Sequence, residues 1–132
     1  MAECWASGLG SCSDKISREH IVSESLFTND IVRVEGFSWC KDKEKEIGLR
    51  SLTAKILCKK HNAALSPVDI GGASAFEAFR NMTKIGNVRK KVQPQIWDVI
   101  QYSIDGILLE RWFLKTLINI SFGGEYPIGE TP

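Results

Sequence analysis

The stretch Ile56-Leu-Cys58-Lys-Lys-His61-Asn62-Ala-Ala-Leu65 decides how this sequence is interpreted. An extended, largely apolar run delivers the chain to Cys58, and a helical pattern begins at His61. The two-residue gap between Cys58 and His61 lets one turn present a thiolate and an imidazole to a single metal ion. The pattern therefore predicts half of a zinc site at the point where a strand passes into a helix.

The N-terminal segment supplies the other half of this expected site. Cys4 and Cys12 flank Trp-Ala-Ser-Gly-Leu-Gly-Ser, a loop flexible enough to fold back on itself, and Cys40 is expected to be a spare thiol. No secretory signal is visible, so we expect a cytoplasmic protein whose cysteines bind metal or stay free. Cys4, Cys12, Cys58 and His61 together make a possible tetrahedral Zn²⁺ set. In the alternative, Cys4 is a terminal thiol and Cys58 only ends a strand.

Hydrolytic groups lie beside each half of the expected zinc site, in Ser17-Arg-Glu19-His20-Ile-Val22 and at Asn62. Successive side chains alternate on an extended chain, so Glu19 can bind a divalent cation while His20 faces a water molecule. Asn62 can offer its carboxamide oxygen to the same cation, and such an oxygen-rich site suits Mg²⁺ or Mn²⁺. The cation would stabilise the leaving oxygen of a phosphodiester while His20 deprotonates the attacking water.

Taken together, these motifs resemble the HNH endonucleases, in particular the branch whose core reads Cys-Cys, then Glu-His-Ile, then Cys-x-x-Cys-Asn. The resemblance covers about residues 4–70. It implies a β-hairpin followed by a helix around one catalytic metal, and metal-dependent hydrolysis of DNA. Carried over, Glu19 and Asn62 would be metal ligands and His20 the general base. The structural zinc ligands would be Cys4, Cys12, Cys58 and His61.

The sequence departs from the family's pattern at three places. His61 stands where the family more often has Cys, and Ser23 stands where a proline often follows Glu-His-Ile. The family's middle Asn, which orients the base, is absent, and Thr53 or Lys55 falls near its place. This absence supports a second hypothesis, a catalytically inactive zinc-stabilised nucleic-acid-binding module. A third hypothesis is a small structural or interaction domain without metal, which zinc content would distinguish.

We expect an α+β fold, with a zinc-stabilised ββα-metal core and additional C-terminal helices, in one domain over residues 1–132. The core is expected over about 4–70, a helical and extended extension over about 71–122, and a tail over 123–132. Residues 31–39 and 49–57 are expected to be extended, with the charged run 41–46 as an exposed turn.

Glycines and prolines punctuate the expected helices. Gly71-Gly72 and Gly86-Asn87 are expected to bound one helix, and Pro94 to open an extended stretch. Asp105 is expected to cap the last helix. That helix should pack through one apolar face made of Leu109, Trp112, Phe113, Leu117 and Ile120.

Basic residues cluster locally although the net charge is only +1. The segment between Glu77 and Asp98 contains no acidic residue, and Arg18, Lys59 and Lys60 lie beside the expected site, where they could position a nucleic-acid strand. We expect DNA as the partner, double-stranded rather than RNA, no membrane association, and a C-terminal tail that either frays or leads to a further domain or partner protein. A solvated face is an equal alternative for the clustered residues, which are Arg80, Lys84, Arg89, Lys90 and Lys91.

Overall fold

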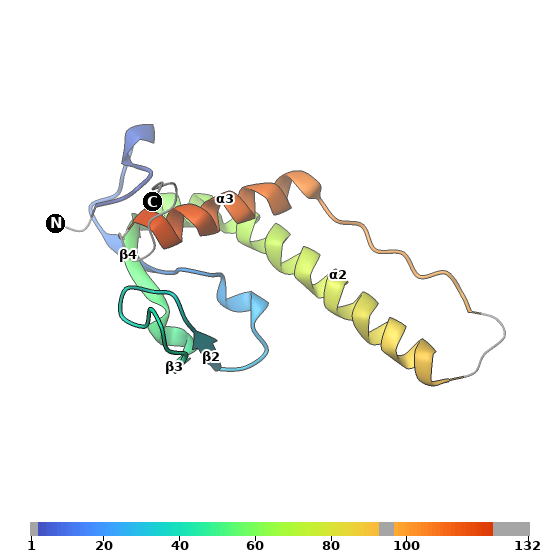
Figure 1. Ribbon diagram of the computed structural model, residues 1–132. Coiled ribbons are helices and arrows are strands. Elements are labelled where there is room, and N and C mark those ends of the chain that lie inside the picture. The colour runs from blue at the N-terminus through green and yellow to red at the C-terminus, as the bar shows by residue number, and fades with distance from the viewer. Residues whose placement is uncertain (1–2, 93–96, 123–132) are drawn as a thin grey trace, which may run out of the picture.

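The computed structural model describes residues 3–92 and 97–122 of the chain and contains both helices and strands, as expected. A β-rich end carries the N-terminal segment, and a long helix extends away from it (Figure 1). The elements in chain order are η1 (Ser7–Leu9), β1 (Ile16–His20), η2 (Glu24–Leu26), β2 (Ile31–Val34), β3 (Lys45–Gly48), η3 (Leu49–Ser51), β4 (Thr53–Cys58), α1 (Lys59–Ala64), α2 (Ser66–Lys91) and α3 (Gly106–Phe122).

Two antiparallel strand pairs make up the β-rich end. β1 pairs with β4 so that Ile16 lies opposite Cys58 and His20 opposite Thr53, with an irregularity between Ser17 and Glu19. β2 pairs with β3, and the charged run between them is exposed as expected, although its last residues already belong to β3. Glu19 and His20 lie on β1, and Cys58 ends β4, which runs directly into α1. Because β1 and β4 are neighbours, the two sequence motifs lie side by side.

The extended stretches expected over 31–39 and 49–57 are wrong in their bounds. β2 ends at Val34, shortly before Gly36 turns the chain with a φ of 90°, and Leu49–Ser51 form η3 before β4 begins.

The helix expected to begin at His61 begins at Lys59 and is interrupted once, at Leu65. α1 ends at Ala64, and α2 begins with Pro67 in its first turn, where a proline costs no hydrogen bond. The expected break at Gly71-Gly72 is wrong, because α2 continues through both glycines. A Cβ at Gly72 would lie 2.4 Å from the Trp112 ring, so these glycines allow close helix packing.

The C-terminal half of α2 also differs from expectation. The predicted helix end at Gly86-Asn87 is wrong, since α2 continues to Lys91. Nothing lies within 4 Å of a Cβ built at Gly86, so no close contact requires a glycine there, and the helix tolerates it at the cost of its low propensity. Residues 97–105 return beside this half of α2 without forming a helix or strand (Figure 1), while Pro94 lies outside the described residues.

α3 begins as expected but packs through a different face. Asp105 Oδ1 accepts a hydrogen bond from the Leu108 amide at 3.0 Å, which confirms the cap. Trp112 is buried, whereas Phe113 and Leu117 remain 49% and 46% exposed, so the expected packing face is wrong in these two positions. The reason is that α3 turns Lys115 and Asn119 inward beside Trp112. In the described part of the chain, no helix is both long and apolar enough to cross a membrane.

Candidate metal centre and neighbouring groove

Three sulfur atoms and one imidazole nitrogen converge at the β-rich end. The donor atoms of Cys4, Cys12, Cys58 and His61 all lie within 4.8 Å of one another. His61 Nδ1 is 3.3 Å from Cys4 Sγ, 3.4 Å from Cys58 Sγ and 3.6 Å from Cys12 Sγ. The structure therefore brings together the four residues that the sequence singled out as zinc ligands.

These distances fit a tetrahedral zinc ion. Zinc–sulfur bonds of about 2.3 Å and zinc–nitrogen bonds of about 2.0 Å place the nitrogen roughly 3.5 Å from each sulfur. Hydrogen bonding alone explains the arrangement poorly, because one imidazole nitrogen has a single lone pair or a single proton for three sulfur atoms. The group can hold a metal ion such as zinc.

Local structure explains how the N-terminal cysteines reach β4. The Trp5 amide donates to the Ile56 carbonyl at 3.0 Å, which places Cys4 beside the end of β4. Gly10 (φ 75°) and Ser11 (φ 56°) both adopt left-handed backbone conformations, which turn the chain so that Cys12 returns to the same place. Cys4 and Cys58 are buried in one small core cluster, whereas Cys12 is exposed.

The thiols differ in their readiness to ionise. Burial opposes ionisation of Cys58, but the backbone N–H groups of His61 and Ser13 donate to its sulfur and lower its pKa to about 6. Desolvation, reinforced by the sulfur atoms of Cys4 and Cys58, raises the pKa of Cys12 to about 11. A thiolate is therefore present at neutral pH, and a divalent cation would displace the proton from Cys12.

The candidate base His20 lies at the end of β1. Its Nε2 atom is buried and has no hydrogen-bond partner among the described residues. The Oε2 atom of Glu24 lies 3.8 Å from His20 Nε2, which is too far for a hydrogen bond. The side chain as a whole is 26% exposed, so part of the ring reaches the surface although Nε2 itself does not.

The two expected cation ligands have protein partners. Glu19 is buried, and its Oε1 accepts a 2.7 Å hydrogen bond from Lys115 Nζ. Asn62 donates through Nδ2 to Ser17 Oγ at 3.2 Å. Among the described residues, no hydrogen bond or ion pair joins Glu19, His20 and Asn62 to one another. The expectation that Glu19 and Asn62 share a divalent cation thus stays a prediction.

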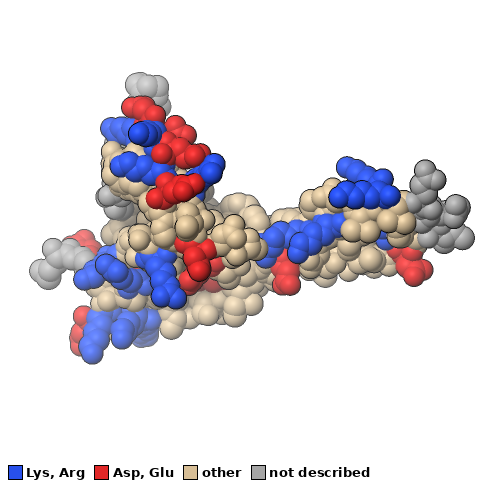
Figure 2. Space-filling model, turned by 90° about the horizontal axis from the view of Figure 1, so that it is seen from below, with Lys and Arg blue, Asp and Glu red and all other residues tan. Residues whose placement is uncertain are grey.

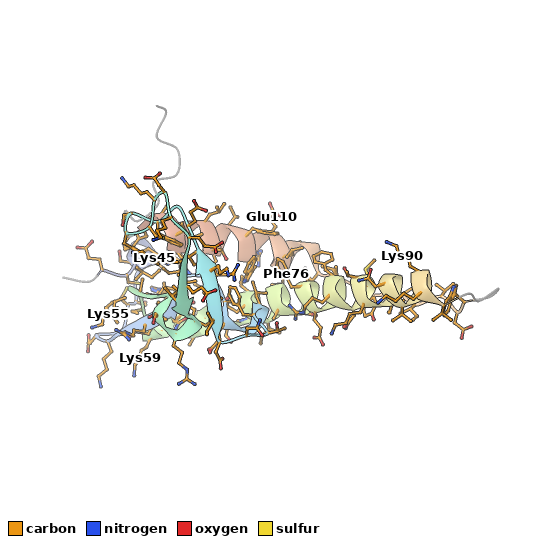
Figure 3. All side chains as sticks on the ribbon, turned by 60° about the horizontal axis from the view of Figure 1, so that its bottom comes forward. Lys45, Lys55, Lys59, Phe76, Lys90 and Glu110 are labelled. Atoms are coloured by element: carbon orange, nitrogen blue, oxygen red, sulfur yellow. The ribbon has the colours of Figure 1, made fainter. Side chains whose placement is uncertain are left out.

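A polar groove of about 410 Å³ adjoins the metal centre, with Ser17, Lys59, Asn62, Ala63, Ser66 and Asp69 along its walls. Asn62 is therefore placed at a surface that an extended ligand can reach. The exposed residues Arg18, Lys59 and Lys60 belong to the two elements that border the groove, β1 and α1. Figure 3 shows Lys55 and Lys59 at this end of the molecule and Lys90 far along α2.

The basic residues of α2 divide into two groups. Arg80 donates to the Leu26 carbonyl at 3.1 Å, and Arg89 donates to the Asp98 carbonyl at 2.8 Å and covers the Trp97 ring. These two arginines help to hold the fold together. Lys84, Lys90 and Lys91 are exposed, and Lys and Arg side chains lie along this helix as well as at the β-rich end (Figure 2).

Sequence reasoning missed a buried polar cluster next to Glu19. Lys115 Nζ contacts the Asp69 carboxylate at 2.6 and 2.8 Å as well as Glu19, and Ser23 donates to Asp69 at 2.7 Å. Trp112 Nε1 donates to Ser23 at 2.9 Å. The available signal was the one lysine of a mostly apolar helix, spaced from Trp112 and Asn119 so that all three share one face.

Comparison with family models, with characterised proteins and with solved structures gives no match to this chain.

Proposed function

We propose that this chain is a zinc-stabilised, metal-dependent endonuclease of the HNH type that hydrolyses phosphodiester bonds in DNA. The observation that carries the proposal is the convergence of Cys4, Cys12, Cys58 and His61, because this set was expected from the resemblance to that family. The zinc would be structural, since its four ligands leave no position for water or substrate.

His20 is assigned as the general base. Its Nε2 has no hydrogen-bond partner among the described residues, and it would accept a proton from water once the partly exposed ring turned toward solvent. Asn62 lies in the polar groove, where Lys59 can neutralise a phosphate of the bound strand. A bound Mg²⁺ or Mn²⁺ would stabilise the leaving oxygen of the cleaved bond.

The ion pair between Glu19 and Lys115 favours a second candidate. If Glu19 remains paired with Lys115, the catalytic cation loses one of its two expected protein ligands. The chain would then be a zinc-stabilised module that binds nucleic acid without cutting it, through the groove and the exposed lysines of α2.

Nicking of a supercoiled plasmid separates the two candidates. With Mg²⁺ or Mn²⁺, the nuclease proposal predicts nicked product from wild type and a rate about a hundred- to ten-thousand-fold lower for His20→Ala. Zinc content and melting temperature should match wild type, because His20 is not a zinc ligand. Failure of wild type to cut with either cation, while it still binds the plasmid, would assign the binding-module function instead.

A further inference from the structure

The outward side of α3 is apolar. Only Glu110, Arg111 and Lys115 carry charge on this helix, and Lys115 points inward. Large hydrophobic side chains that are between 38% and 63% exposed occupy the outer face of α3, namely Ile107, Phe113, Leu114, Leu117, Ile118 and Phe122. The helix therefore has an inverted arrangement, with two of its polar side chains buried and six of its hydrophobic side chains partly exposed.

The rotation of α3 about its axis is fixed by the buried contacts. Lys115 forms ion pairs with Glu19 and Asp69, and Asn119 accepts a 3.0 Å hydrogen bond from Trp5. Close packing of Trp112 against Gly72 leaves no room for the helix to turn. Because rotation would break this network, the outer face of α3 cannot be buried by rearrangement within the chain's described fold.

The exposed surface is large enough for a specific interface. A large apolar side chain carries on the order of 150 to 200 Å² of surface, so the outer face of α3 presents roughly 500 Å² per chain. Two such faces cover about 1,000 Å², the lower limit for a biological interface. An apolar patch of roughly 500 Å² is as large as the largest patch on a typical monomer, and such patches are often functional.

Charge indicates what kind of partner fits. The outer side of α3 exposes one acidic and one basic side chain, Glu110 and Arg111, so it attracts neither a polyanion nor a polycation. Figure 3 shows Glu110 on α3 and Phe76 on the side where α3 meets α2. A second copy of the same face can cover it, because two apolar faces that each carry one acidic and one basic side chain do not repel each other.

We propose that two copies of this chain form a homodimer by packing the outer faces of α3 against each other about a two-fold axis. A two-fold axis lets a single self-complementary patch cover itself. The exposed lysines of α2 lie outside this contact, which avoids like-charge repulsion. The interface is small, so we expect dissociation in the micromolar range.

Sedimentation velocity over a micromolar concentration series tests the proposal on the full chain. Wild type should shift from monomer to dimer as concentration rises. Leu114→Asp should raise the dissociation constant at least about a hundredfold, because each dimer would bury two unpaired carboxylates. Ile70→Asp is the matched control, since Ile70 is a 66% exposed aliphatic residue in α2 outside the outer face of α3. This variant should dimerise like wild type.

Two results would overturn the homodimer. One is a wild type that stays monomeric throughout the series, including one that instead binds neutral phosphatidylcholine vesicles. The other is a Leu114→Asp variant that dimerises as tightly as the Ile70→Asp control. Circular dichroism of both variants, matched to wild type, ensures that loss of dimer does not reflect unfolding.

Discussion

At the scale of single residues, Lys115 is the most consequential side chain that the sequence patterns did not reveal. Its ammonium group is buried between Glu19 and Asp69, so two charges, those of Lys115 and Glu19, are removed from water, while Asp69 stays partly exposed. Desolvation of such a group is expensive, and the ion pairs offset that cost only while every partner is present. Loss of the lysine would leave Glu19 buried without a counter-charge.

Lys115→Met should therefore destabilise the protein by about 3 to 5 kcal/mol, although methionine is close to lysine in length and replaces its aliphatic stem. Lys90→Met is the control, because Lys90 is exposed on α2, and its effect should stay within about 0.5 kcal/mol. Urea unfolding of both variants measures the difference. Equal stabilities would mean that the buried cluster contributes nothing to folding.

At the scale of elements, the contact between α2 and α3 depends on glycine. Gly71 and Gly72 sit inside a helix, where glycine is intrinsically unfavourable, yet Leu108 and Trp112 occupy the space that their side chains would fill. A pair of glycines predicts a helix break, but glycine inside a helix can also allow another helix to pack closely. Only the position of α3 decides between these two roles, and contacts between residues distant in the sequence set that position.

Gly72→Ala and Gly86→Ala should have effects of opposite sign on the same helix. At Gly72 the new methyl group would meet the Trp112 ring, and overpacking should cost about 1 to 3 kcal/mol. At Gly86 the space is open, so alanine should stabilise by about 0.4 to 1 kcal/mol. Thermal or urea unfolding checks both. Stabilisation by Gly72→Ala would show that α3 does not pack closely there.

At the scale of the whole molecule, the sequence identified the metal centre better than the fold around it. Spacing and chemistry select Cys58 and His61 because two ligands on one turn are a local feature. The mixture of strands and helices and the Asp105 cap also follow from local patterns. The inward direction of Lys115 depends on Glu19 and Asp69, which are distant in the sequence, and no local pattern contains that information.

A metal ion bound by the four candidate ligands would also hold the N-terminal segment in place. Cys4 and Cys12 precede β1, while Cys58 and His61 lie where β4 passes into α1, so an ion bound to all four would close the chain between residues 12 and 58. Metal binding of this kind contributes directly to the free energy of folding. Zinc is therefore expected to hold β1, β4 and α1 together.

Elemental analysis of the full chain, purified without chelator, tests this claim most directly. The account predicts about one zinc per chain in wild type. Cys58→Ala should lose the metal and unfold at a lower temperature, whereas Cys40→Ala should keep it, since the buried Cys40 is not among the four ligands. Wild type without zinc, or Cys58→Ala with as much zinc as Cys40→Ala, would contradict it.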